Sequence, residues 1–548
     1  ATLPASKKQW LVTLGVSLPV MFVLSYLSLP VMSWSNGNLW GSLFVIYAFI
    51  KFVIYLATMD SIDPRVVRPN HEKAISIGVS VVVVAIMVFI FGSSTTIFNG
   101  KQHAQILDIQ EETEVFDPSS VLMDTTQARF VDGDLALRAT KEKLGEKIGL
   151  GTRSEIDESS IQSIGGKLVW VSPLSHKSVF KYLSNEEVDG YITVSASKFS
   201  DTKATLDQPM KFGTNGFYFN GDVERHLYFN GYHSTFLTDY TLEIDDTGKP
   251  FWVVSKYEKL VGVQGRKVIG VVIVDAATGD IQDLPLSEIA EKAPWVDRVQ
   301  PEAIVMEQIE SWGGYQKGFW NYLFVGEGVL NPTDGLSLVY TKDGRSMWYT
   351  GLQSGSSQEG TVGFMLVDTK TGEATFYRRT GITEEVAKRA IEGKVQEFGY
   401  KASNPIPYNV NGTSTFVSVL KDDKGNPQMI GMVAYDDRSV LAVGENLETV
   451  LRRYQLAQSQ SGAEMNLGED RVLVELEGVL DRVGFQQVDA HASLHFTLQN
   501  DPEGRVFTVS GSDSARYILS RPGDRVKIGY IDTGSDPIIV REFENTEL

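Results

Sequence analysis

Apolar residues are concentrated in three stretches of the first hundred positions. Residues 10–32 and 74–92 contain no charged side chain, and residues 39–59 contain one, Lys51. A helix needs roughly 20 mainly apolar residues to cross the hydrocarbon core of a bilayer. The pattern therefore predicts three transmembrane helices, which together form an N-terminal membrane anchor over residues 1–92.

The basic residues beside these stretches predict how the chain is oriented. Lys7 and Lys8 precede the first stretch, the loop 60–73 carries three basic residues, and Lys101 is the basic residue close behind the third stretch. Basic flanks favour the cytoplasmic side of a membrane. We therefore expect a cytoplasmic N-terminus in the cell (inner) membrane and an extracytoplasmic location for residues 93–548, which in a bacterium is the periplasm.

Lys51 is the one charged residue within the predicted spans, and it allows two interpretations. A charge near the middle of a span is costly, and such residues often mark a buried partner or an ion path. The same lysine can also face a polar groove between helices or extend its amine to the interface. No acidic residue lies inside any of the three stretches to pair with it. Both interpretations stay open.

Beyond residue 131 the hydrophobic pattern alternates between helical and strand periodicity. Residues 132–149, 300–313 and 383–400 place apolar side chains at helical spacing, and each precedes short alternating segments. A helix followed by an antiparallel meander is an α+β module. The predicted fold class is therefore α+β, with repeated modules behind the membrane anchor. Its parts are a linker over 93–131, modules over 132–299, 300–382 and 383–455, a linker over 456–470, and a small β-barrel over 471–548.

One phrase occurs twice in the middle of the chain. "IVDAATGD" contains Asp275 and Gly279, and "LVDTKTGE" contains Asp368 and Gly372, 93 residues later. An Asp side chain can accept hydrogen bonds from N–H groups two residues further on, and Gly provides the positive φ that closes such a turn. A calcium loop would need more oxygen ligands at alternating positions. We therefore interpret these four residues as structural turns. A weaker third copy begins at Ser414.

The two phrases resemble PepSY-type and cystatin-like modules, in which a helix precedes a meander of three or four strands. The resemblance covers roughly residues 130–450. It implies an extracytoplasmic, often membrane-tethered protein, and a role in binding or inhibiting peptidases.

Two other segments have distinctive compositions. Residues 210–240 are rich in Phe, Tyr, Gly and Asn and contain "YFNG" twice, which suits either sheet core with Asn-Gly turns or an interaction surface. In the barrel, three strands, a short helix and two strands follow an OB-like order. His491 and His495 share one strand face there, but no third metal ligand is evident.

Composition narrows the possible functions. The formal net charge is -19 and the pI is about 4.9, which argues against nucleic acid as a partner. The chain has no Cys, so disulfides and thiolate chemistry are excluded. The chain contains no phosphate-binding loop, dinucleotide fingerprint, nucleophile elbow or zinc-protease motif, so we expect neither an enzyme nor a cofactor or metal.

Together these patterns favour a membrane-anchored structural or interaction protein in an envelope or virus-like assembly. Its expected partners are membrane lipid and either other proteins or sister copies in a homo-oligomer. The alternative is an extracytoplasmic regulator or sensor that binds a peptide or a peptidase.

Overall fold

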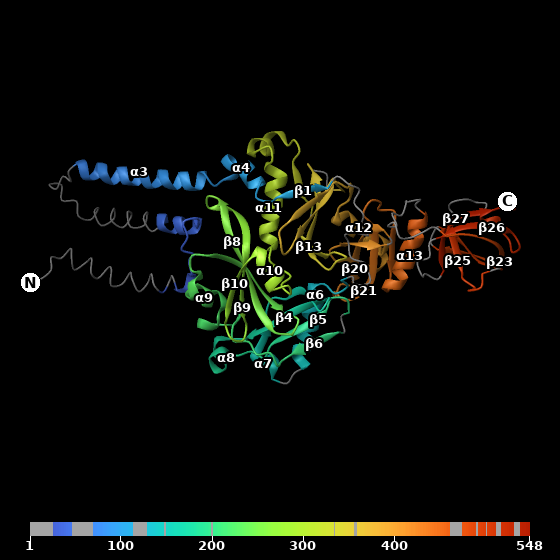
Figure 1. Ribbon diagram of the computed structural model, residues 1–548, viewed down its shortest axis with the longest axis horizontal. Helices are drawn as coiled ribbons and strands as arrows, with labels where there is room; N and C mark the ends of the chain where they lie inside the picture. Colours follow the sequence, from blue (N-terminus) through green and yellow to red (C-terminus); the bar gives the residue numbers. More distant parts are fainter. Residues whose placement is uncertain are drawn as a thin grey trace, which may run out of the picture.

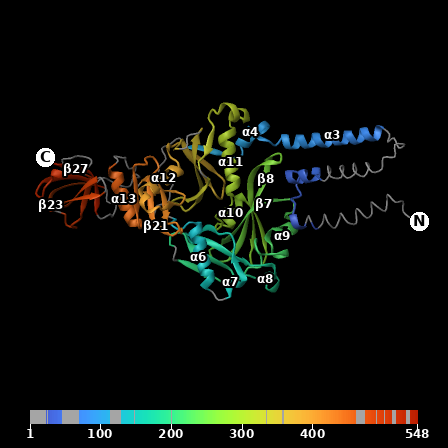
Figure 2. The ribbon, with the colours of Figure 1, turned by 180° about the vertical axis from the view of Figure 1, so that it is seen from behind.

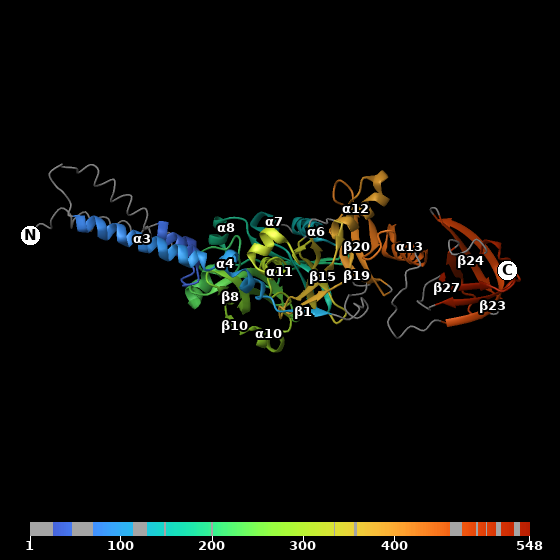
Figure 3. The ribbon, with the colours of Figure 1, turned by 90° about the horizontal axis from the view of Figure 1, so that it is seen from above.

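The computed structural model describes residues 23, 26–45, 70–112, 129–146, 149–198, 201–333, 335–355, 359–410, 412–460, 474–488, 491–499, 501–510, 517–530 and 537–548. The described parts form an elongated molecule. Helix α3 (Asn70–Gly92) projects from one end and a C-terminal barrel forms the other, as the views from the front, the back and above agree (Figures 1, 2 and 3). Strand is the more abundant secondary structure, at 38% against 31% helix.

The fold differs from the predicted one in its membrane part. Among the described residues, the segment Gly78–Ala104 is the one long and apolar enough to cross a membrane. Most of the first predicted span and residues 46–59 of the second lie outside the described residues. Between them, residues 29–36 form a loop that the globular part holds, with the Met32 N–H donating to the carbonyl of His233. The predicted α+β fold with three N-terminal transmembrane helices is therefore wrong, because the described residues are richer in strand and contain one candidate span, and apolar composition alone does not separate a span from a segment packed on the globular part.

The globular part contains four main sheets in sequence order, in which the strands pair antiparallel except β1 (Ile109–Glu112), which joins the third sheet in parallel. The helices before and between their strands are α6 (Gly133–Glu146), α7 (Leu150–Arg153), α8 (Val179–Ser184), α9 (Val223–Leu227), α10 (Leu286–Lys292), α11 (Glu302–Tyr315), α12 (Glu384–Lys394) and α13 (Leu447–Gln460), with shorter turns η2 (Phe219–Gly221), η3 (Tyr228–Tyr232), η4 (Asn321–Val325) and η5 (Gln396–Phe398).

Apart from β1, each sheet is built from strands that are close in sequence. The first contains β2 (Ser154–Ile156), β3 (Ser160–Ile164), β4 (Lys167–His176), β5 (Tyr191–Ser195) and β6 (Thr202–Thr205); the second β7 (Phe236–Ile244), β8 (Pro250–Val261), β9 (Gln264–Asp275) and β10 (Ile281–Pro285). The third contains β11 (Leu330–Pro332), β12 (Ser337–Tyr340), β13 (Ser346–Ser354), β15 (Gly363–Asp368) and β16 (Ala374–Tyr377), and the fourth β18 (Lys401–Ala402), β19 (Ile406–Val410), β20 (Thr413–Lys421), β21 (Pro427–Ala434) and β22 (Leu441–Gly444). A two-stranded pair, β14 (Gly360–Thr361) with β17 (Gly381–Ile382), lies between the last two.

One hydrogen-bond arrangement recurs in all four sheets of the described residues. In the first, the N–H groups of Phe130 and Val131 both donate to the carbonyl of Ala196, at 2.9 and 2.8 Å, and helix α6 follows directly. The extended segment before a helix is thus hydrogen-bonded to the turn that follows an inner strand of its own sheet, here β5. These bonds satisfy backbone groups that burial would otherwise leave unpaired. We name this arrangement the entry clamp. The corresponding residues are Lys211, Phe212 and Ala276 in the second sheet, Val299, Gln300 and Thr369 in the third, and Ile382 and Tyr435, with one N–H donor, in the fourth.

An aromatic ring completes each entry clamp. The indole N–H groups of Trp170, Trp252 and Trp348 donate to the second residue of the fastened segment, at 2.8, 2.9 and 2.8 Å. In the strand register, each of these tryptophans, and Phe416 in the fourth copy, pairs with a valine on the neighbouring strand. In every copy that valine stands two residues before the residue whose carbonyl accepts the clamp hydrogen bond. The identical register shows that the four units repeat one plan, over residues 130–205, 211–285, 299–377 and 382–444.

The segment expected to be a linker, residues 93–131, contains ordered elements. Helix α4 (Thr96–Ala104) buries His103 and Ala104, and Ile106 and Leu107 are buried after it. Strand β1 (Ile109–Glu112) then pairs in parallel with β16 at the edge of the third sheet. Edge pairing and burial explain why this polar-looking segment is fixed.

The aromatic segment 210–240 also differs from the predicted Asn-Gly hairpin. Its two "YFNG" copies are a 3₁₀ turn, η2, and a π-helical turn, η3, joined by α9. Asp222 caps α9 by accepting from the Arg225 N–H at 2.8 Å, and the cap favours a helix over a strand at this point.

The C-terminal residues form a closed barrel. Its strands are β23 (Val474–Val488), β24 (His491–Leu498), β25 (Phe507–Ser510), β27 (Ile538–Asn545) and β26 (Arg525–Tyr530), in that order around the barrel, with the short turn η6 (Tyr517–Leu519) before β26. Strands β25 and β27 pair in parallel, and β23 pairs with β26 to close the ring. Phe496, Phe507 and Ile528 fill the interior.

Candidate functional site

The first of the two repeated turns follows β9. Asp275 accepts from the N–H groups of Ala277 and Thr278 at 2.8 and 3.0 Å, and Gly279 has φ +79°. Burial alone would raise the pKa of this carboxyl, but the ammonium of Lys249 and the two amides hold the pKa below its ordinary value. A β-carbon on Gly279 would lie 2.5 Å from the ring of Phe212, a residue of the entry clamp.

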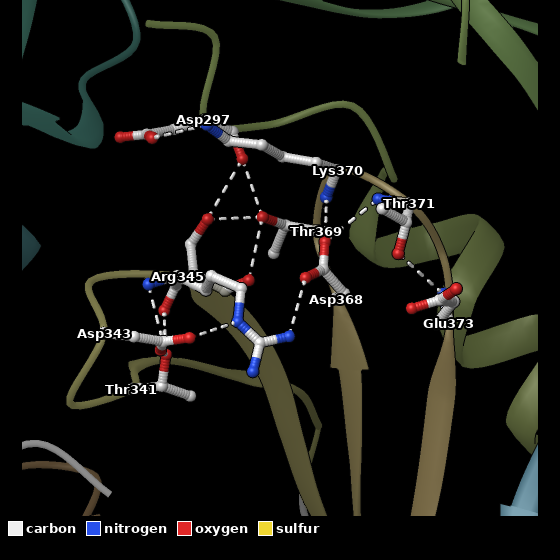
Figure 4. A network of polar contacts seen from close by, with 10 residues as sticks. Asp297, Thr341, Asp343, Arg345, Asp368, Thr369, Lys370, Thr371 and Glu373 are labelled. Carbon is white, nitrogen blue, oxygen red and sulfur yellow. Dashed lines mark hydrogen bonds and ion pairs between the residues drawn. The ribbon is translucent and has the colours of Figure 1, made fainter. Parts of the chain in front are cut away.

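The second turn follows β15 and repeats this geometry. Asp368 accepts from the N–H groups of Lys370 and Thr371 at 2.8 and 2.9 Å, and Gly372 has φ +78° (Figure 4). A β-carbon on Gly372 would lie 2.9 Å from the amide nitrogen of the Gln300 side chain. The two turns belong to different sheets, so the structure does not bring Asp275 and Asp368 into one site. Instead, each turn provides the acceptor carbonyl of an entry clamp, at Ala276 after Asp275 and at Thr369 after Asp368.

Asp297 links the second turn to the preceding unit. Its carbonyl accepts from the hydroxyls of Ser346 and Thr369, at 3.1 and 2.6 Å, and Lys370 Nζ lies 3.8 Å from its carboxylate (Figure 4). The carboxylate itself accepts from the N–H of Ser163 in the first sheet. One residue thus contacts two sheets of the stack.

A second carboxyl group is buried beside Asp297. Glu243, on β7, is 1% exposed and accepts from the N–H groups of Asp297 and Arg298 at 2.8 and 3.2 Å. Burial and the neighbouring Asp297 charge raise the pKa of Glu243 to about 8, against the opposing effect of both N–H groups and Arg298. Arg298 in turn forms an ion pair with Asp239 at 3.1 Å. We name Glu243, Asp297 and Arg298 the junction, and it joins the first three sheets.

The strongest candidate for contact with a partner lies elsewhere, at the foot of α3. The hydroxyl of Ser94, which is fully buried, accepts from the Val263 N–H at 3.0 Å and donates to the carbonyl of Ile90 at 2.7 Å. His103 bonds the carbonyl of Ser94 at 2.9 Å. The tip of the β8–β9 hairpin, residues 260–264, is therefore fixed against the end of α3.

The loop 29–36 completes this foot. Tyr228 in η3 donates to the carbonyl of Pro30 at 3.1 Å, and the ring of Phe229 lies 5.9 Å from that of Tyr26. A β-carbon on Gly37 would lie 3.4 Å from the side chain of Val263. We name residues 29–37, 91–95, 228–233 and 260–264 the collar. It leaves large apolar side chains exposed around the base of α3, namely Trp34, Phe229 and Leu260.

Aromatic side chains that surround an apolar helix suit a membrane–water interface, because their rings are apolar and their polar atoms accept water contacts. The position of the collar also agrees with a membrane–water interface. The collar lies at the end of the globular part from which α3 projects (Figures 1 and 2). Its arrangement can hold a folded domain at a bilayer surface.

The other candidate residues do not assemble into a site within the described part of the chain. Lys51 lies outside the described residues. His495 is half-buried in the barrel without a described hydrogen-bond partner for its Nε2, and partial burial lowers its pKa. In the same part of the chain, no three His, Asp or Glu side chains are grouped to hold a metal ion.

Sequence reasoning missed the entry clamps, the junction and the collar. The available signal for the clamps was a tryptophan in the strand before each of three turns, at residues 170, 252 and 348, each of which pairs with the valine before its turn. The clamp acceptors are backbone carbonyl groups. Every residue type has one, so the residue types in the sequence do not predict where the clamps form.

Comparisons with known proteins show no family. No family model matches the chain, and no curated protein matches it. Among solved structures, an endo-arabinase from Bacteroides thetaiotaomicron is 11% identical with a TM-score of 0.16, over 53% of this chain and 74% of that one. A Trypanosoma rangeli sialidase is 10% identical with a TM-score of 0.14, over 71% and 54%. A GDP-Man-dependent mannosyltransferase from Leishmania mexicana is 10% identical with a TM-score of 0.17, over 67% and 91%. Likenesses this low say nothing about the function of the chain.

Proposed function

We propose that this chain is a membrane-attached interaction protein, which holds a stack of four clamped units and a barrel outside the cytoplasm for protein partners or sister copies. The observation that carries the proposal is the surface of α3. Most of its valines and both of its phenylalanines are exposed, with Val81 and Phe89 at 62% and 73%. A large exposed apolar surface on one helix is expected of a helix covered by lipid and not of one in water.

The side of the membrane is supported by the flanks of α3. Arg65, Arg68 and Lys73 precede the apolar core of the helix, and Lys101 follows it in α4. Basic residues favour the cytoplasmic flank. In this proposal the globular units therefore lie on the extracytoplasmic side.

The stacked units support an interaction role. Each unit closes on itself through its entry clamp, and the junction joins neighbouring sheets through buried hydrogen bonds. Such an arrangement gives an extended, stiff surface of the kind that repeat proteins use to bind partners.

The test is purification of the full chain from its own membranes in a mild detergent, followed by mass measurement of the intact complex. A matched control replaces α3 with an unrelated apolar helix, which keeps the attachment but none of the native helix contacts. The proposal predicts a complex of defined stoichiometry, of several copies or with other envelope proteins, and the same complex for the control.

Two results would contradict it. A monomer without stoichiometric partners, from crosslinked membranes as well as from detergent, would remove the interaction role. A co-purifying peptidase whose activity the chain inhibits would favour a regulator.

A further inference from the structure

A second apolar surface lies on the same side of the globular part as the collar. Helix α8 exposes Phe180 and Leu183, at 78% and 61%, and Phe219 in the adjoining turn η2 is 50% exposed. The ring of Tyr182, on the buried side of α8, lies 6.5 Å from the ring of Phe219. We name Phe180, Leu183 and Phe219 the knob.

The backbone of the knob is strained. Phe219 has φ +50°, one of three positive values at residues other than glycine in the described part of the chain. Bulky side chains rarely adopt this conformation, because it costs energy that the surrounding structure must offset. The side chain on this strained backbone is an aromatic ring that is 50% exposed. Such an outlier points to a use for the exposed ring.

The knob is continuous with the collar. Arg225 of α9 reaches the carbonyl of Phe219 at 3.5 Å, and its guanidinium lies 4.8 Å from the centre of the Tyr26 ring. Tyr26 in turn contacts Phe229 of the collar. Helices α8 and α9 both lie at the end of the globular part that faces α3 (Figures 1 and 2). One face therefore runs from the foot of α3 through α9 to the knob.

The surroundings of the knob suit lipid headgroups. Lys177 and Lys181 are exposed on either side of Phe180. Long lysine side chains can lay their methylenes beside inserted rings while the ammonium groups stay among phosphates. A protein partner remains the other possible cover for such a surface. Continuity with a collar that surrounds an apolar helix favours lipid.

We propose that the knob inserts into the headgroup region of the bilayer that α3 crosses, as a second contact between the globular part and the membrane surface. This inference rests on the proposed attachment through α3. Because α3 would already hold the knob near the surface, the contact is intramolecular and needs little intrinsic affinity. It would fix the tilt of the clamped stack relative to the membrane.

The absence of Cys allows a direct test. Three full-length variants, Leu183→Cys, Phe398→Cys and Val82→Cys, are labelled with an environment-sensitive fluorophore and reconstituted into phosphatidylcholine nanodiscs. Phe398 is 56% exposed in η5, which directly follows α12, and α12 lies far from α3 (Figure 1), so Phe398 is the matched control for an exposed apolar residue. Quenching by nitroxide-labelled lipid reports contact with the bilayer, and quenching by iodide reports contact with water.

We expect the label at position 183 to be quenched by nitroxide lipid and several-fold less by iodide than the label at position 398. Phe180→Glu should abolish the nitroxide quenching when it is added to the Leu183→Cys variant, and should leave the quenching unchanged when it is added to the Val82→Cys variant.

Equal iodide quenching at positions 183 and 398 would overturn the inference, provided that position 82 is quenched by nitroxide lipid. Protection of position 183 from iodide without nitroxide quenching would mean that protein covers the knob, and would also overturn it. A label at position 82 that lipid does not quench would refute the attachment itself, and the inference with it.

Discussion

The junction predicts a specific dependence of stability on pH. Glu243 is buried with a pKa of about 8, well above the ordinary value of 4.5. An acid whose pKa is raised by folding contributes stability that is fully present below its unfolded pKa and is lost as the pH rises through its folded pKa. The contact between the first three sheets should therefore weaken between pH 4.5 and 8. The substitution Glu243→Gln removes the ionisation and isolates its effect.

The magnitude follows from the same shift. One pKa unit corresponds to about 1.4 kcal/mol, so a rise from 4.5 to about 8 limits the loss to at most about 5 kcal/mol. The amide side chain introduced by Glu243→Gln would offer one acceptor oxygen to the two N–H groups that now bond both carboxylate oxygens, which costs about 1 kcal/mol. The variant should therefore be slightly less stable than the native chain at pH 5 and more stable at pH 9, and the two stability curves should cross.

Hydrogen exchange at the amides of residues 295–300 measures this effect locally, after correction for the pH dependence of intrinsic exchange. Protection of these amides in the native chain should fall as the pH rises from 5 to 9, and in Glu243→Gln the fall should be much smaller. Glu258→Gln, at an exposed glutamate of the same sheet, is the matched control and should keep the native slope. Protection that stays constant or increases with pH in the native chain would refute the reasoning, as would a native slope in Glu243→Gln.

Further predictions concern the turns, the clamps and the collar. In a denaturant titration, Gly372→Ala should lower the free energy of unfolding by more than the roughly 1–2 kcal/mol of left-handed strain, since its β-carbon also meets the clamp residue Gln300. The control Gly344→Ala, at φ +82° with no neighbour within 4 Å, should show the strain alone. Trp348→Phe removes the indole hydrogen bond and leaves a cavity at a side chain that is 4% exposed, so it should cost about 2–3 kcal/mol and leave the fold intact by circular dichroism. A loss of folding would contradict this local role. Ser94→Ala should increase hydrogen exchange in the hairpin tip 260–264 and leave the barrel unaffected, while unchanged exchange at the tip would mean that the collar does not depend on this hydroxyl.

Parts of this structure could be predicted because short-range chemistry determines them. The Asp and Gly residues of the two turns act within five positions, so their types and spacing predict the geometry at Asp275 and Gly279. The helices at residues 133–146, 302–315 and 384–394 follow from apolar spacing in the same way. Local signals of this kind need no knowledge of distant parts of the chain.

Other parts depend on contacts between distant residues. The turn of the first clamped unit has Ser195 where the two phrases have their first Asp, and it contains no Gly, so the phrase that identifies two other units is absent around Ala196. Glu243 and Asp297 are 54 positions apart and meet through backbone N–H groups. The described end of the first apolar stretch is held by hydrogen bonds from Met32 to His233 and from Tyr228 to Pro30, contacts that composition does not reveal.

The most direct test of the account is the orientation of α3. Single cysteines introduced as Asn70→Cys at its start and Gln105→Cys just beyond α4 are exposed to a membrane-impermeant maleimide in spheroplasts, before and after permeabilisation. The account predicts that Gln105→Cys reacts in intact spheroplasts and that Asn70→Cys reacts only after permeabilisation. Equal reaction of both cysteines before permeabilisation, or the reverse order, would contradict it.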